Sequence, residues 1–117
     1  MDLKTLIEQL RKAADREVHR VDVPEWGVTL YVRAMSGRDR DWFDMALTSE
    51  DRSEKIGIRA RVIAKCLCTE TGERYPYSED LVDALAERNA AVLSRVFDFI
   101  CKISGIGSDA AAEAKKN

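Results

Sequence analysis

Histidine, cysteine and proline are scarce in this chain. Of its 117 residues, one is histidine, three are cysteine and two are proline. His19 is the single imidazole, and Cys66, Cys68 and Cys101 give a C-x-C spacing in place of the four ligands that a structural zinc site needs. We therefore expect no metal centre, and we expect three buried, reduced thiols of the kind that a cytosolic protein contains.

No catalytic or phosphate-binding motif occurs in the sequence. His19 lies in a predicted strand without a recognisable Ser or Cys nucleophile motif. Asp39, Asp41 and Asp44 alternate with arginines on a predicted helix, which favours ion pairing along the helix over metal binding. The single G-x-G follows the last predicted helix, so it does not present a helix N-terminus to an anion. We expect a protein that is not an enzyme and that carries no cofactor.

Long apolar runs and a strong excess of one charge are also absent. The chain has 19 basic and 21 acidic residues, a net charge of −2, and it lacks the basic patch of a nucleic-acid-binding domain. Its apolar runs are too short for a transmembrane helix, and its charged, amphipathic N-terminus does not have the form of a signal peptide. We expect proteins as partners, with no nucleic acid and no membrane.

The apolar residues that are present suffice for one core. Hydrophobic residues make up 45% of the chain and charged residues 34%, as in an ordinary globular domain. A chain of this length has room for one such domain. We predict a single globular domain over residues 1–107. Residues 108–117 contain no large apolar side chain, so we predict a disordered C-terminal tail there.

Hydrophobic periodicity predicts an α+β fold that is mainly α-helical, with about five amphipathic helices and one N-terminal β-hairpin over about residues 17–34. The first helix reaches to about Ala14 and has one apolar stripe to bury. The residues of this stripe are Leu3, Leu6, Ile7 and Leu10. Pro24–Gly27 then reverses the chain between two strands, whose apolar face must lie against the helices because an isolated hairpin is marginally stable.

Four more helices are predicted in the rest of the chain. Ser36, Ser78 and Asn89 are residue types that cap helix N-termini. The remaining helix has a strong apolar face, made of Ile56, Ala60, Ile63 and Leu67. A loop that contains both a glycine and a proline covers residues 69–77, and a glycine stop at Ser104-Gly105 ends the last helix.

Four residues are predicted to contact partners: Trp26, Tyr31, Arg33 and Trp42. Tryptophan and tyrosine are enriched at the energetic centres of protein interfaces, and Trp26 lies on a turn, where burial is least automatic. Tyr31 and Arg33 share the polar face of a predicted strand. The alternative for the two tryptophans is structural, with Trp42 in the core and Trp26 covering the end of the hairpin.

The order of these parts suggests a family. The stretch VDVPEWGVTLYVRAMSGRDRDWF combines a V-P-x-W-G turn, a strand ending in Arg33 and a Ser-Gly helix start. The stretch CLCTETGERYPYSEDLVDALAER places a T-x-x-G loop before an acidic helix, and the last helix ends at SGIG. Over roughly Val18–Gly107 the sequence resembles the tail assembly chaperones of long-tailed bacteriophages (siphoviruses) and prophages.

The resemblance implies a viral protein of the host bacterial cytoplasm that is absent from the mature virion. Such a chaperone binds the tape measure protein, keeps it soluble during tail tube assembly and forms an oligomer. The family commonly makes a longer product by ribosomal frameshifting, through which the tail tube protein would be reached. Lys115, Lys116 and Asn117 can be encoded by a run of adenines on which a ribosome slips. The alternative function is a small helical adaptor or regulatory protein that binds one folded partner.

Overall fold

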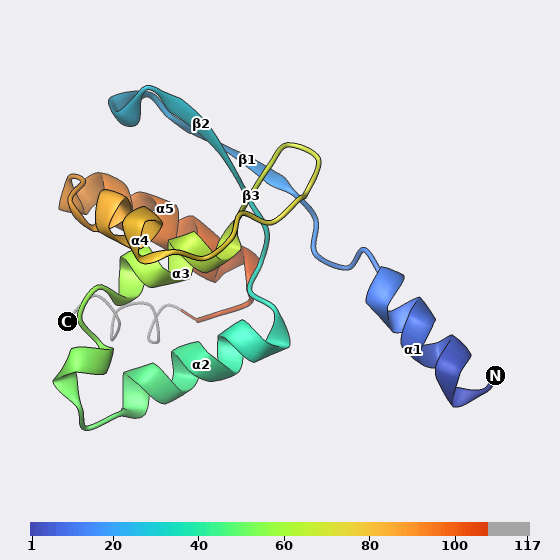
Figure 1. The fold of residues 1–117 in the computed structure, drawn as a ribbon. Coiled ribbons are helices and arrows are strands. Elements are labelled where there is room, and N and C mark those ends of the chain that lie inside the picture. The colour runs from blue at the N-terminus through green and yellow to red at the C-terminus, as the bar shows by residue number, and fades with distance from the viewer. Residues whose placement is uncertain (108–117) are drawn as a thin grey trace.

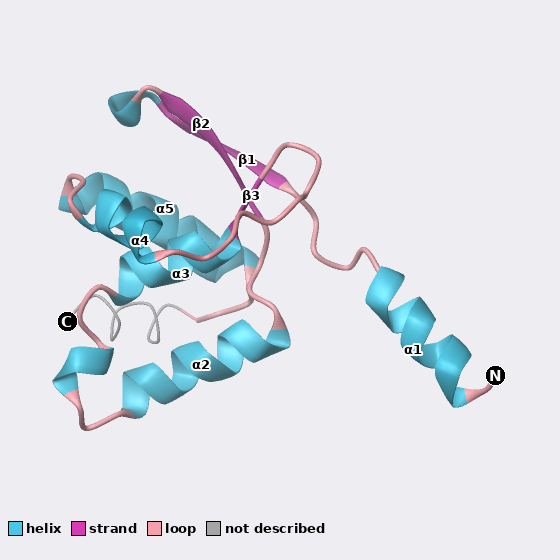
Figure 2. Ribbon diagram, in the orientation of Figure 1, coloured by secondary structure: helices cyan, strands magenta, loops and turns pink. Residues whose placement is uncertain are grey.

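Five α-helices and a three-stranded antiparallel sheet make up residues 1–107, the part of the chain that the computed structural model describes (Figures 1 and 2). The helices are α1 (Leu3–Lys12), α2 (Gly37–Thr48), α3 (Ile58–Cys66), α4 (Glu79–Ala86) and α5 (Ala90–Ile103). The strands are β1 (His19–Val23), β2 (Val28–Val32) and β3 (Leu67–Cys68), and short 3-10 turns lie at Pro24–Trp26 and Arg52–Glu54. The predicted mainly helical α+β fold is confirmed. No helix among these residues is long and apolar enough to cross a membrane.

The helix ends follow the capping residues of the sequence. The Ser36 hydroxyl accepts a hydrogen bond from the Asp39 N–H at 3.1 Å, and the Ser78 hydroxyl accepts one from the Leu81 N–H at 3.2 Å. At the end of α5, Gly105 has a φ of 72°, and the N–H of the buried Ile106 bonds back to the Cys101 carbonyl at 2.9 Å. This is a glycine-based C-terminal cap with its apolar contact, as predicted.

The predicted hairpin is confirmed, and the sheet has one more strand. β1 and β2 pair in the register His19↔Val32 to Val23↔Val28, with Gly27 at a φ of 67° closing the turn. β3 pairs with the last two residues of β2, so the strand order is β1-β2-β3. β3 follows α3 directly in the chain, a sharp change from helix to strand that periodicity did not indicate.

The predicted apolar face of α3 is wrong at both of its ends. Gly57 adopts a φ of 73° and the helix begins after it, which leaves Ile56 outside the helix and exposed. Leu67 is extended because it pairs with Val32 in the sheet. Between these ends α3 is the most deeply buried helix of residues 1–107, and it packs on both α4 and α5.

The core lies between α3, α5, α2 and one face of the hairpin. Phe43 on α2 and Phe97 on α5 are fully buried, with their ring centroids 6.1 Å apart. Val23 and Val32 bring the hairpin into the same apolar cluster. The three cysteines are buried in or beside it, as expected. The apolar face of the hairpin thus lies against the helices, as the sequence required.

Helix α1 does not join this core, so the expectation that its stripe is buried is wrong for this chain taken alone. The helix ends at Lys12 and extends away from the body (Figure 1). None of its residues is buried, and Leu3 and Leu10 are 72% and 65% exposed. The physical reason lies in the connection to β1, which is held against the rest of the domain through the Arg16 guanidinium and leaves most of the α1 stripe without a facing surface. That guanidinium donates a hydrogen bond to the Ala34 carbonyl at 3.4 Å.

Candidate functional site

The His, Cys, Asp and Glu side chains of the described residues were candidates for a metal site in the sequence. Within residues 1–107 no group of three or more His, Cys, Asp or Glu side chains is placed to hold a metal ion. The His19 ring lies edge-on against Phe99, with 5.7 Å between the ring centroids. Burial raises the pKa of the Cys66 thiol to about 12, which keeps it protonated and weakly nucleophilic.

Trp26 lies at the tip of the hairpin and packs its ring partly against the core. Its indole N–H is buried and donates to no acceptor within residues 1–107. The neighbouring Glu25 carboxylate accepts two hydrogen bonds from the Arg95 guanidinium, at 2.5 and 2.9 Å, and these lower the pKa of Glu25 to about 2. The ion pair fixes the hairpin tip to α5, and Trp26, at the same tip, keeps an unused hydrogen-bond donor.

Trp42 belongs to a different surface, formed by α2 and α3. Its half-buried ring faces the Lys65 ammonium group, which lies 4.7 Å from the Trp42 centroid and 4.6 Å from the Tyr77 centroid. A cation between two aromatic faces is favourable electrostatically, so Lys65 connects α2 with the loop before α4. A hollow beside Trp42 is lined in addition by Arg38, Asp41 and the exposed Met45.

Arg33 lies near the C-terminal end of α1. Its backbone N–H bonds to the Cys66 carbonyl at 3.0 Å and extends the pairing of β2 with the end of α3. Its side chain lines a largely polar hollow together with Leu10, Ala14 and Thr71. Arg33 is therefore close to the connection between α1 and the body, and apart from both tryptophans.

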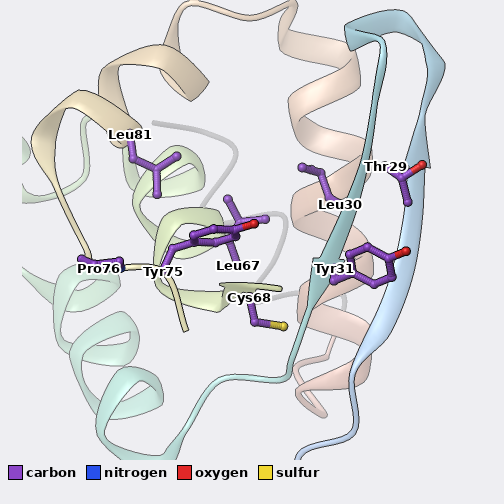
Figure 3. A pocket seen from close by; sticks show the side chains of 8 residues that line it. All are labelled: Thr29, Leu30, Tyr31, Leu67, Cys68, Tyr75, Pro76 and Leu81. Atoms are coloured by element: carbon purple, nitrogen blue, oxygen red, sulfur yellow. The ribbon is translucent and has the colours of Figure 1, made fainter. Parts of the chain in front are cut away.

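Tyr31 lines a largely apolar groove of about 410 Å³ between β2 and the start of α4. This β2–α4 groove is lined by Thr29, Leu30, Tyr31, Leu67, Cys68, Tyr75, Pro76 and Leu81. In Figure 3, β2 supplies one wall, the segment before α4 supplies the other, and Leu67 and Cys68 lie between them. Of the β2 residues, β3 pairs with Tyr31 and Val32, and its Cys68 also forms a bridge with Arg74, so the groove opens where β2 continues beyond its short partner.

The four predicted contact residues thus do not form one site, and Tyr31 alone lines the β2–α4 groove. Sequence reasoning missed Tyr75, Pro76 and Leu81, which form the opposite wall. A signal was available, because two tyrosines and a proline interrupt an otherwise charged loop. The exposed stripe of α1 was recognised as apolar but was assigned to the core.

Comparison with known proteins adds one structural match. No protein-family model matches the sequence, and no curated protein matches it. The fold is similar to the solved structure of the bacteriophage HK97 tail assembly chaperone, with a TM-score of 0.55 and 22% sequence identity, over 86% of this chain and 95% of that chain. The resemblance seen in the sequence is confirmed at the level of the fold, and the chain has the fold of a phage tail assembly chaperone.

Proposed function

We propose that this chain is a bacteriophage tail assembly chaperone that binds a tape measure protein and keeps it soluble while the tail tube assembles. The observation that carries the proposal is the fold match, which extends over nearly the whole length of the HK97 chaperone. The described residues offer apolar surfaces to which a protein partner can bind.

The surfaces fit a client that is long, helical and apolar. An amphipathic helix binds by laying its apolar face into a hydrophobic groove. The chain has such a groove between β2 and α4, and it has an exposed apolar stripe on α1. Exposed apolar surfaces of this kind mark interaction sites on small soluble domains.

The remaining parts of the proposal concern where the protein works and what else it contacts. It acts in the host cytoplasm, is left out of the mature virion and associates with its own copies. A longer frameshifted form would reach the tail tube protein. The slippage site proposed at Lys115–Asn117, and the disordered tail predicted for residues 108–117, lie outside the described residues.

Co-expression tests the chaperone role. A phage tape measure protein is produced in bacteria with and without this chain, and the soluble fraction of the tape measure protein is measured. We expect the soluble fraction to rise with the dose of this chain, and several copies to co-purify with each tape measure protein. An unchanged soluble fraction would refute the proposal, and one copy per folded partner would favour the adaptor.

A further inference from the structure

Helix α1 is a formed helix without a partner surface in its own chain. Asp2 caps it by accepting a hydrogen bond from the Thr5 N–H at 2.8 Å, yet none of its residues is buried. A helix of 10 residues is marginal in water without tertiary packing. Its apolar residues share one face, which we call the α1 stripe: Leu3, Leu6, Ile7 and Leu10. The stripe therefore needs a surface supplied from elsewhere.

The β2–α4 groove is an apolar surface of matching character on the same molecule. Its wall residue Tyr75 is 46% exposed. Leu30, Leu67 and Leu81 lie deeper and are partly or fully buried. The groove thus offers an apolar floor and an aromatic rim, which is what the leucine and isoleucine side chains of a helix require.

Charge favours the same pairing. The α1 helix carries three basic residues and one acidic residue: Lys4, Arg11, Lys12 and Glu8. The segment of residues 69–83 that borders the groove carries five acidic residues and one basic residue: Glu70, Glu73, Glu79, Asp80, Asp83 and Arg74. Lys4 and Arg11 are seven residues apart, so they lie on one side of α1, next to the stripe. A helix seated in the groove would bring its positive flank to a negative border.

The connection to β1 favours the groove of another molecule over the chain's own. The Arg16 guanidinium bonds to the Ala34 carbonyl, and Val18 packs closely on Gly72, so the connecting segment is held against the body. Figure 1 shows α1 running outward from this attachment. Only the short segment between Lys12 and Arg16 then connects α1 to this attachment. Docking on a second molecule preserves the Arg16 and Val18 contacts.

We propose that the α1 stripe of one copy docks into the β2–α4 groove of a second copy of this chain. This deepens the self-association named in the proposed function and rests on it. The two contacting surfaces are different, so the second copy still has a free α1 and the first still has a free groove. Such a heterologous contact generates a ring or an open chain of copies, and it does not stop at a dimer.

Complementary variants of the full chain test this geometry. Leu6→Glu places a charge in the stripe, and Tyr75→Glu places one in the groove wall. Thr5→Glu on the opposite side of α1 and Ala84→Glu on the exposed side of α4 are matched controls. Sedimentation velocity measures the assembled mass across a concentration series. Circular dichroism checks folding, and Tyr31→Glu serves as the second groove variant if Tyr75→Glu is misfolded.

We expect the parent and both controls to grow beyond a dimer with concentration. The stripe variant and the groove variant should each lose at least about tenfold in association constant, as loss of an interface hot spot does. Their equal mixture should form a dimer that grows no further, because one intact stripe then meets one intact groove. A groove variant that still assembles by itself, or a parent that stays monomeric, would overturn the docking.

The solubility of the tape measure protein is scored separately in the same samples. A monomeric parent that keeps the client soluble would refute the docking and leave the proposed function standing. A parent that assembles through α1 but leaves the client insoluble would support the docking and refute the proposed function.

Discussion

Replacing a leucine by alanine should have different effects on the free energy of unfolding in the core and in α1. Leu93 on α5 is 5% exposed and belongs to the apolar cluster, whereas Leu10 on α1 is 65% exposed. Leu93→Ala removes buried methyl groups and leaves a cavity, which costs about 2–5 kcal/mol in the free energy of unfolding. Leu10→Ala truncates a mostly exposed side chain at the edge of a hollow, so the unfolding free energy of the monomer should change by less than about 0.5 kcal/mol.

The assay is urea unfolding followed by circular dichroism at a protein concentration low enough for the parent to sediment as a monomer. Both variants are compared with the parent at equal concentration, so that any gain from association is absent. A loss of about 2 kcal/mol or more in Leu10→Ala under these conditions would show that α1 packs on its own chain in solution. A loss below about 1 kcal/mol in Leu93→Ala would refute the assignment of α5 to the core.

Four further results are expected. Trp26→Ala and Arg33→Ala should each weaken binding to the tape measure protein or to neighbouring copies by about 2 kcal/mol while the helical circular dichroism is kept, and unchanged pull-downs for both would remove these residues from the interface. The Arg95 guanidinium lowers the pKa of Glu25 from 4.5 to about 2, so the stability that this pair adds is complete above pH 4.5 and is lost as the pH falls toward 2. In an acid titration, the folding stability of Glu25→Gln should therefore decline less steeply over that range than the stability of the parent. Identical curves would contradict the pair. Because burial raises the pKa of Cys66 to about 12, its alkylation at neutral pH should be slow in the native protein and fast in urea, and fast native labelling would show that the site opens. Deletion of residues 108–117 should leave the midpoint of thermal unfolding nearly unchanged, and an AAG codon at position 116 would exclude ribosomal slippage there.

The sequence predicted those parts of the fold that depend on neighbouring residues. Ser36, Ser78 and Asn89 cap helices because their side chains reach backbone N–H groups two or three residues ahead. Pro24 and Gly27 reverse the chain because each restricts or permits particular φ values within the turn. Such interactions are complete within a few residues, so a linear pattern records them.

The remaining features depend on residues far apart in the sequence. Leu67 is a strand residue because Val32 pairs with it, and nothing near Leu67 indicates that partner. The apolar pattern of α1 shows that one face needs a partner but does not say whether the partner is the same chain. For the candidate site, Tyr31 was predicted from its own strand, whereas the opposite groove wall comes from a loop more than 40 residues later.

The cap at the end of α5 anchors the chain to the folded domain just before Gly107. Gly105 turns the chain, and the buried Ile106 is held by the bond from its N–H to the Cys101 carbonyl. The Ser104 hydroxyl, next to this turn, accepts a hydrogen bond from the Met35 N–H at 2.9 Å and so fastens the cap to the start of α2. Tension or motion in polypeptide joined after Gly107 therefore meets an anchored residue before it reaches α5. The cap is an anchor at the end of α5, and it allows the folded domain to keep the same shape whether a short or a long segment is attached.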